Sequence, residues 1–245
     1  QIAPASPEVV AELILGMRDP DLPVRLKSID ALSETGAAAA DALTPLIELL
    51  KEGENAVRIQ AMRTLAILLP HKDAKDAYLS MMEALNDKIP EIRLLAATVL
   101  GNMLNPPLKP AQPNAVFDIQ AENRAAVYAA LLRAAKDEMP NVRSKVLEVL
   151  GANPNSAAVA IPILIASLKD TQPEVRQRAG EALAAFGAAA RDAVPALIAT
   201  LSDAPAPRTI AETIKKIGLD SKTDVTLLIE ALPGKTADSR IQLIG

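Results

Sequence analysis

Gln172-Pro173-Glu174-Val175-Arg176 is one copy of a short pattern that recurs along this chain of 245 residues. In the other copies an aliphatic residue again precedes an arginine: Val24-Arg25, Val57-Arg58, Ile92-Arg93 and Val142-Arg143. The residue numbers of successive arginines differ by 33, 35, 50 and 33, and Arg240 follows Arg176 by 64, or two steps of 32. A period of about 33 residues, each holding two helix-length apolar patterns, is typical of stacked helical hairpins.

The sequence therefore predicts an all-α fold, an α-α superhelix (solenoid) of about seven helical hairpins with the last one truncated. The expected units are residues 6–36, 39–70, 74–104, 121–152, 157–187, 190–218 and 222–245. Ser6-Pro7-Glu8 opens the first unit with a Ser N-cap and a Pro at the first helical position. Gly36 ends that unit, because glycine can adopt the left-handed conformation that closes a helix.

A proline-rich insertion at 105–120 interrupts the period. Its prolines exclude a helix, since each lacks an amide donor and disfavours the α region for the preceding residue. Pro107-Leu108-Lys109-Pro110 fits PxxP, so the insertion is either a recognition loop or a tolerated surface loop. If it binds a partner, we expect Leu108 and Phe117 to contribute.

Composition restricts the chemistry open to the chain. It has no Cys, which excludes disulfides, thiolate nucleophiles and zinc–sulfur sites. The net charge of −4 and the 2% aromatic content argue against a nucleic-acid footprint. No apolar run approaches the roughly 18 residues of a membrane span. A soluble chain is expected, and its start at Gln1 without Met is compatible with an upstream signal peptide that has been removed.

The sequence carries no recognisable motif for catalysis or cofactor binding. It has no Gly-rich phosphate loop, and its one histidine has no matched nucleophile. His71 with Asp73 and Asp76 is a conceivable metal site, but a lone surface histidine is far commoner. We therefore expect no catalytic residues, no metal and no cofactor, in a protein that is not an enzyme.

The arginine series is the most regular polar feature of the sequence. An acidic residue stands six positions before each arginine, in the pairs Asp19/Arg25, Glu52/Arg58, Asp87/Arg93, Asp137/Arg143 and Asp170/Arg176. A guanidinium group can engage two acceptors at once. We predict a structural ladder in which each arginine bridges acids of its own unit and of a neighbouring unit. A row of anion-binding sites is the alternative.

A second row of residues lies two and five positions past each arginine, on one face of each second helix. It comprises Lys27/Asp30, Gln60/Arg63, Leu95/Thr98, Lys145/Glu148 and Arg178/Glu181, with Leu94 beside Leu95. The residue types differ from unit to unit on a repeated frame, as a partner-binding surface requires. A plain solvated face is the alternative interpretation.

Three kinds of segment carry a resemblance to a known family. The chain resembles HEAT repeats in two first-helix segments, Ala160-Ile161-Pro162-Ile163-Leu164-Ile165 and Ala193-Val194-Pro195-Ala196-Leu197-Ile198. It also resembles them in the second-helix segment Pro173-Glu174-Val175-Arg176 and its relatives. The resemblance is to the phycobilisome-lyase HEAT-like subgroup and covers nearly the whole chain except 105–120. It implies a right-handed superhelix with first helices outside and second helices lining a concave face.

Such repeats occur in scaffolds, chaperone-like adaptors, chromophore lyases and some DNA-repair glycosylases. We expect a non-catalytic scaffold that binds a peptide or protein partner on the concave face, with no nucleic-acid or membrane partner. A bilin lyase-like, chromophore-handling protein and a repeat spacer within a larger enzyme are the alternatives. The sequence leaves the compartment and the oligomeric state open.

Overall fold

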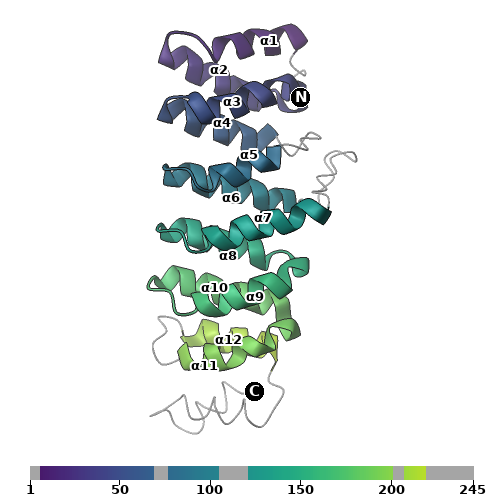
Figure 1. Cartoon of the computed structure of the whole chain (residues 1–245), viewed down its shortest axis with the longest axis vertical. Helices are drawn as coiled ribbons and strands as arrows, with labels where there is room; N and C mark the ends of the chain where they lie inside the picture. Colours follow the sequence, from purple (N-terminus) through teal and green to yellow (C-terminus); the bar gives the residue numbers. More distant parts are fainter. Residues whose placement is uncertain (1–5, 69–76, 105–120, 201–206, 219–245) are drawn as a thin grey trace. The chain divides into compact units, whose positions relative to one another are not determined.

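The computed structural model describes residues 6–68, 77–104, 121–200 and 207–218, and every regular element in these ranges is a helix (Figure 1). The predicted all-α class is thereby confirmed. The chain divides into two compact units, Gln1–Ala130 and Leu131–Gly245. The insertion with Leu108 and Phe117, the candidate metal site at His71, and the last predicted hairpin lie outside the described residues.

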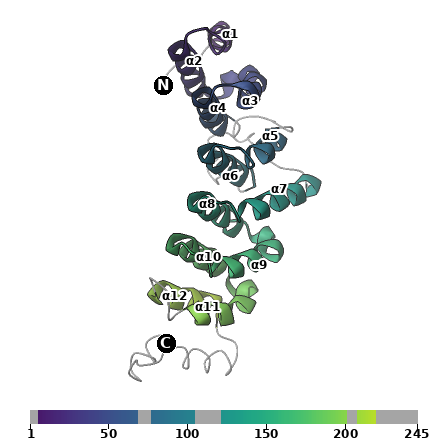
Figure 2. The same cartoon turned by 60° about the vertical axis from the view of Figure 1, so that its left-hand side comes forward.

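In the described residues up to 104, first helices alternate with second helices. The first helices are α1 (Pro7–Gly16), α3 (Leu43–Glu52) and α5 (Ala77–Ala84), and the second helices are α2 (Leu22–Glu34), α4 (Asn55–Leu68) and α6 (Pro90–Leu104). The 3₁₀ segment η1 (Gly36–Ala42) precedes α3. Second helices pack on one another in sequence order, α2 on α4 and α4 on α6, and each first helix packs on its own second helix (Figure 2). Helix α7 (Ala121–Ala134) contains the boundary between the two units.

The second unit repeats this arrangement. Its elements are α8 (Pro140–Gly151), η3 (Pro154–Ser156), α9 (Ala157–Ser167), α10 (Pro173–Phe186), η4 (Gly187–Ala193), α11 (Val194–Thr200) and α12 (Pro207–Ile217). Helix α10 packs between α8 and α12. Helix α12 begins at Pro207, as α8 and α10 begin at Pro140 and Pro173.

Local sequence explains where these helices begin and end. Ser6 is the N-cap of α1 and accepts a hydrogen bond from the amide of Val9, as predicted. Gly36 and Gly187 have φ of +58° and +54°, so each can follow its helix in a conformation that other residues rarely adopt. Both glycines begin 3₁₀ segments, η1 and η4, which extend into the starts of the hairpins predicted at 39–70 and 190–218.

The second helices approach closely because small residues lie between them. A Cβ added to Gly151 in α8 would lie 2.4 Å from the Cβ of Ala182 in α10. In the first unit the buried hydroxyl of Thr64 in α4 donates to the carbonyl oxygen of Ile29 in α2 at 3.1 Å. These contacts position the side chains of successive second helices side by side within each unit.

One helical segment among the described residues, Pro173–Ala199, is long and apolar enough to cross a membrane by composition. The bent pair Pro140–Gly151 and Pro154–Ser167 would be a second candidate if it were one span. Pro173–Ala199 consists of α10, η4 and α11, and it contains Gly187 at positive φ. Core helices of soluble proteins pass the same test, so this composition is not evidence of a membrane span.

Candidate functional site

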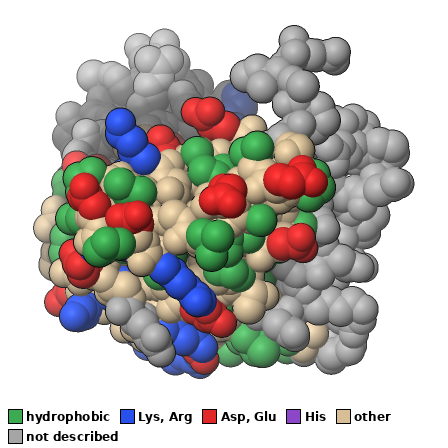
Figure 3. All heavy atoms as spheres, turned by 90° about the horizontal axis from the view of Figure 1, so that it is seen from above, with side chains coloured by type: hydrophobic (Ala, Val, Ile, Leu, Met, Phe, Trp, Pro, Cys, Tyr) green, Lys and Arg blue, Asp and Glu red, His purple; other side chains and the backbone are tan. Residues whose placement is uncertain are grey.

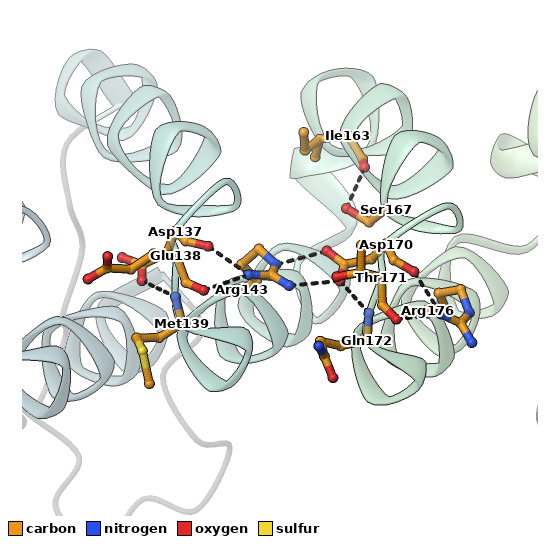
Figure 4. A network of polar contacts seen from close by, with 10 residues as sticks. All are labelled: Asp137, Glu138, Met139, Arg143, Ile163, Ser167, Asp170, Thr171, Gln172 and Arg176. Atoms are coloured by element: carbon orange, nitrogen blue, oxygen red, sulfur yellow. Dashed lines mark hydrogen bonds and ion pairs between the residues drawn. The ribbon is translucent and has the colours of Figure 1, made fainter.

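Arg143, in the first turn of α8, connects two successive turns of the second unit (Figure 4). Its Nη1 donates to the carbonyl oxygens of Asp137 at 2.8 Å and Glu138 at 3.1 Å. Its Nε and Nη2 donate to Oδ2 and Oδ1 of Asp170 at 2.8 and 2.7 Å. This is the paired, charge-assisted geometry that a guanidinium fork makes with a carboxylate.

Asp170 also organises its own turn. Its Oδ1 accepts a hydrogen bond from the amide of Gln172 at 2.9 Å, and its carbonyl oxygen accepts one from Nη1 of Arg176 at 2.7 Å. Burial alone would raise the pKa of Asp170. The hydrogen bonds from Arg143 and Gln172, together with the charges of Arg143 and Arg176, outweigh burial and lower the pKa. The carboxylate is therefore ionised at neutral pH.

The same contacts recur in the first unit. Nη1 of Arg25 donates to the carbonyl oxygens of Asp19 and Pro20 at 2.8 and 3.0 Å, and its Nη2 donates to Glu54 at 2.7 Å. Arg58 donates to the carbonyl oxygen of Leu50 and pairs with the carboxylate of Asp87. Arg93 donates to the carbonyl oxygen of Asp87 at 2.8 Å. We call these arginines and their acceptors the ladder.

The ladder differs in two respects from the sequence prediction. The described acceptors of Arg25 and Arg58 at the turn that contains Glu52 are Glu54 and the carbonyl oxygen of Leu50. In the other four pairs, the acid six positions before the arginine contributes its backbone carbonyl, while its carboxylate accepts from the amide two positions later. These carboxylate-to-amide pairs, at 2.8–2.9 Å, are Asp19/Asp21, Asp87/Ile89, Asp137/Met139 and Asp170/Gln172. Aspartate favours such Asx turns, so it closes the turn between the two helices of a repeat and leaves the carbonyl for the arginine. Glu52 is not in this group, and its side chain is outside what the structure describes.

Most ladder side chains are less exposed to solvent than the residues two and five positions further on, although Glu54 in the ladder is 65% exposed and Lys145 in the row is 28% exposed. The side chains of Arg58 and Asp87 are 12% and 10% exposed, and those of Arg143 and Asp170 are 13% and 14% exposed. In the row, Arg178 and Glu148 are 41% and 45% exposed. A ligand can therefore reach the row, whereas most of the ladder is enclosed by the repeats that it joins.

The row residues also pair across neighbouring second helices. Gln60 in α4 donates to Asp30 in α2 at 3.0 Å, and Arg178 in α10 lies 3.9 Å from Glu148 in α8. The pairs Lys145/Glu148 and Arg178/Glu181, both at 2.8 Å, lie within single helices. Arg63 pairs with Glu91, which stands just before the ladder position of α6.

In α6 the row becomes apolar. Leu94 and Leu95 are half-buried, and the hydroxyl of Thr98 donates to the carbonyl oxygen of Leu94 at 2.9 Å. Lys27 in α2 is exposed. The row in the first unit thus combines charged groups on α2 and α4 with an apolar site on α6.

A further set of pairs, which join the C-terminal end of one first helix or the turn after it to the next first helix, was missed in the sequence. Arg18 lies 3.1 Å from Glu48, and Lys51 lies 3.7 Å from Glu83. Arg18 and Lys51 are separated by one repeat period, so the periodicity could have indicated them. In the described part of the chain, no group of three His, Cys, Asp or Glu side chains could hold a metal ion.

Comparison with known proteins agrees with this geometry. A model of HEAT repeats matches residues 111–184, 128–218 and 161–244, which together span 111–244, or 134 of the 245 residues. The chain belongs to the HEAT repeat family. The family resemblance read from its sequence is confirmed, and protein binding is typical of this generally non-enzymatic fold.

Solved structures share the fold of this HEAT repeat protein. An engineered protein is 18% identical with a TM-score of 0.61, over 91% of this chain and 97% of the other. A designed armadillo repeat protein in complex with the peptide (KR)4 is 17% identical with a TM-score of 0.60, over 86% and 99%. The CpcE–CpcF complex of phycocyanin lyase from Nostoc sp. PCC7120 is 21% identical with a TM-score of 0.51, over 72% and 99%. No curated protein sequence matched the chain.

Proposed function

We propose that this HEAT repeat protein is a non-catalytic scaffold that holds a peptide or an extended protein segment against the row on its second helices. In the first unit the proposed contacts are Lys27, Asp30, Gln60, Arg63, Leu94, Leu95 and Thr98. In the second unit they are Lys145, Glu148, Arg178 and Glu181. The contrast in exposure between the row and the ladder is the observation that carries this proposal.

The ion pairs of the row and those of the ladder contribute differently to stability, which favours different roles for them. Exposed ion pairs such as Arg178 with Glu148 contribute only about 0–1 kcal/mol to stability. A ligand that replaces one member of such a pair therefore costs the fold little. Breaking an enclosed pair such as Arg143 with Asp170 leaves a charge with little access to water, which costs about 3–5 kcal/mol. The ladder is thus suited to holding repeats together, and the row to exchanging partners.

The row presents both signs of charge and one apolar site. Lys145, Glu148, Arg178 and Glu181 alternate basic and acidic groups across α8 and α10, so a segment with both signs would find complementary charges there. Leu94 and Leu95 on α6 would accept an apolar anchor, the kind of contact that dominates most interfaces.

The likeness to a designed armadillo repeat protein in complex with a peptide supports a peptide-binding surface as a use of this fold. We attach no lyase activity to the chain, because its likeness to the phycocyanin lyase structure is 21% in sequence and concerns the fold.

The experiment is a selection from a displayed library of random peptides against the full chain. Glu148→Arg with Arg178→Glu keeps an opposite-charge pair between α8 and α10 but places like charges beside Lys145 and Glu181; because these side chains are partly exposed, the fold should lose little stability. We expect the selected peptides to lose at least about tenfold in affinity for this variant, since two charged contacts become repulsive. The matched control exchanges the exposed pair Arg18 and Glu48 on the first helices. If the selected peptides keep their affinity for the row variant, or lose affinity only for the control variant, the proposed surface is wrong.

A further inference from the structure

The first unit joins successive repeats on their first-helix side through ion pairs at two repeat positions. Arg18 stands seven positions before the ladder arginine of its repeat and lies 3.1 Å from Glu48 of the next repeat. Lys51 stands at the same position one repeat later and lies 3.7 Å from Glu83. Both acids stand ten positions before the ladder arginines of their own repeats. A base at the first position is thus complemented by a carboxylate at the second position of the next repeat.

The second unit keeps the bases and lacks these acids. Lys136 and Lys169 stand seven positions before the ladder arginines of α8 and α10, but the residue ten positions before the arginine of α10 is Ala166. Helix α11, the next first helix, contains no acidic residue. Both lysines are exposed, and so is Arg133 in the last turn of α7. Within the described ranges, no carboxylate pairs with any of these three bases.

An uncharged apolar stripe on α9 continues toward one of these bases. Val159, Pro162 and Ala166 recur at helical spacing on the exposed side of α9, and Val159 is 41% exposed. The turn continues to Lys169, whose amide donates to the carbonyl oxygen of Ala166 at 3.2 Å. Helix α9 itself contains no charged residue. We call these apolar residues and bases the outer basic face, which comprises Arg133, Lys136, Val159, Pro162, Ala166 and Lys169.

The first unit has a different balance of charge on its first helices. Helices α1, α3 and α5 each contain at least one Glu, and Figure 3, which looks onto α1 and α2, shows acidic side chains among the hydrophobic ones. In contrast, segments 131–136 and 157–169, which supply the outer basic face, contain three bases and no acid. The exposed acids that come next along the chain, Glu138 and Glu174, belong to a turn and to a second helix. The positive charge of the outer basic face is therefore not balanced within its own segments.

We propose that the outer basic face binds an acidic amphipathic helix of another protein. In the first unit helices supply the complementary carboxylates, Glu48 from α3 and Glu83 from α5, so a helix can present a carboxylate to these base positions. Lys136 and Lys169 are one repeat apart, and packed helices lie about 8–10 Å from one another. That spacing matches the roughly 10 Å between residues i and i+7 of a single helix. Apolar residues between two such carboxylates would contact the stripe on α9.

Two other occupants fit this face less well. A second copy in a symmetric pairing would bring the same three bases against this face, and like charges disfavour that contact. An anionic membrane also attracts bases, but surfaces that enter the interface usually insert Trp, Phe or Leu. The exposed apolar residues here are Val159, Pro162 and Ala166, which suit packing against a helix better than insertion into lipid.

The probe is the helical peptide LEELLELLEELLEL, which has a leucine stripe and glutamates that recur at i and i+7. Its affinity for the full chain is measured by fluorescence anisotropy at about 0.15 M salt, where long-range charge effects are screened. Lys136→Glu with Lys169→Glu should weaken binding at least about tenfold, because two attractions become repulsions. Both lysines are exposed and have no described carboxylate partner, so the variant should unfold at the wild-type temperature. Lys136→Gln with Lys169→Gln should also weaken binding if the glutamate variant does not fold.

Three comparisons make the result specific. Lys27→Glu with Lys88→Glu changes two exposed lysines of the first unit by the same net charge and should leave the affinity unchanged. Val159→Gln with Ala166→Gln places amides in the apolar contact while keeping good helix formers, and it should weaken binding at least about fivefold. A peptide of the same composition with its leucines distributed around the helix should bind at least about tenfold more weakly, because it lacks an apolar face.

Four outcomes would overturn the proposal. The first is a wild-type chain that does not bind the peptide. The second is an equal loss of affinity in the Lys27/Lys88 control, which would show a response to net charge alone. The third is binding to vesicles of phosphatidylserine and phosphatidylcholine that the Lys136/Lys169 variant loses, which would make this face a membrane contact. The fourth is self-association that the same variant abolishes, which would place a second copy there.

The row on the second helices is tested separately from the outer basic face. The Glu148/Arg178 exchange changes only the row, so it should leave the affinity for the acidic peptide unchanged. The Lys136/Lys169 variant should in turn keep its affinity for peptides selected on the row. Failure of one proposed surface therefore leaves the test of the other intact.

Discussion

Arg143 donates two hydrogen bonds to the carboxylate of Asp170 in the next repeat, and Asp170 in turn offers its carbonyl oxygen to Arg176. One aspartate therefore contacts the arginines of two successive repeats. Because both contacts are directional, they fix how far the turn of one repeat lies from the second helix of the repeat before it. We therefore expect the ladder in the second unit to set the register of the repeats as well as to stabilise them.

Arg143→Ala should lower the free energy of unfolding by about 3 kcal/mol, because it removes the fork and leaves the Asp170 carboxylate enclosed without its partner. Urea unfolding followed by circular dichroism measures the change. Arg143→Lys keeps the positive charge but loses the fork, so it should recover only part of the stability.

Binding provides the complementary measurement for the same variant. At a temperature where Arg143→Ala remains folded, its affinity for row-selected peptides should equal that of the wild type, because the guanidinium lies away from solvent. Unchanged stability with lost binding would reverse the assignment and make the ladder a ligand site.

The lowered pKa of Asp170 predicts a specific dependence of stability on pH. A carboxyl whose pKa is lower in the folded state stabilises the fold above the unfolded value of about 3.9 and loses this contribution as the pH falls through the folded pKa. Asp170→Asn should therefore be less stable than the wild type at pH 7, and the difference should shrink in strong acid. Midpoints of urea unfolding, measured from pH 7 down to strong acid for the wild type and Asp170→Asn, test this prediction. The charge-matched control is Asp192→Asn, which changes an exposed acid in η4.

Gly151→Ala should destabilise the second unit by about 1–3 kcal/mol through overpacking, since the new Cβ would lie 2.4 Å from the Cβ of Ala182. The control is Gly180→Ala in α10, where the nearest atom to a new Cβ is the Thr213 hydroxyl oxygen at 3.6 Å. There the gain in helix propensity should make the substitution neutral or stabilising by up to about 1 kcal/mol. If both substitutions change the free energy of unfolding by the same amount, α8 and α10 can move apart freely to accommodate the new Cβ.

The period of the arginines was sufficient to predict the helical hairpins, because a residue that joins one repeat to the next must recur in each. The arginines in this series donate to turn carbonyls of their own repeats, but the period did not indicate Glu54 or Leu50 as acceptors. The role of the preceding acid was not predictable in the same way. A carboxylate six positions away could pair with the guanidinium or close its own turn, and the sequence alone does not distinguish these geometries.

Solvent exposure shows a second limit of a repeat pattern. Val24, Val57 and Val175 have the same residue type at the same repeat position, yet they are 41%, 2% and 0% exposed. Burial depends on whether another helix covers the position, and the residue type at that position does not show this. The 3₁₀ segments η1 and η4 were missed for a different reason. Their alanine-rich sequences favour an α-helix, but Ala39 and Ala190 have non-helical ψ angles of 21° and 17°.

Arg178→Ala should separate the row from the ladder most directly. Arg178 is 41% exposed and its two acidic partners are similarly exposed, so the free energy of unfolding should fall by only about 0–1 kcal/mol. Peptides selected on the wild-type surface should nevertheless lose affinity, because Arg178 supplies the positive charge between Glu148 and Glu181. The two quantities are measured by urea unfolding and by fluorescence anisotropy. A stability loss as large as that of Arg143→Ala, with peptide binding retained, would make the row a second structural ladder and remove the physical basis of the proposed binding surface.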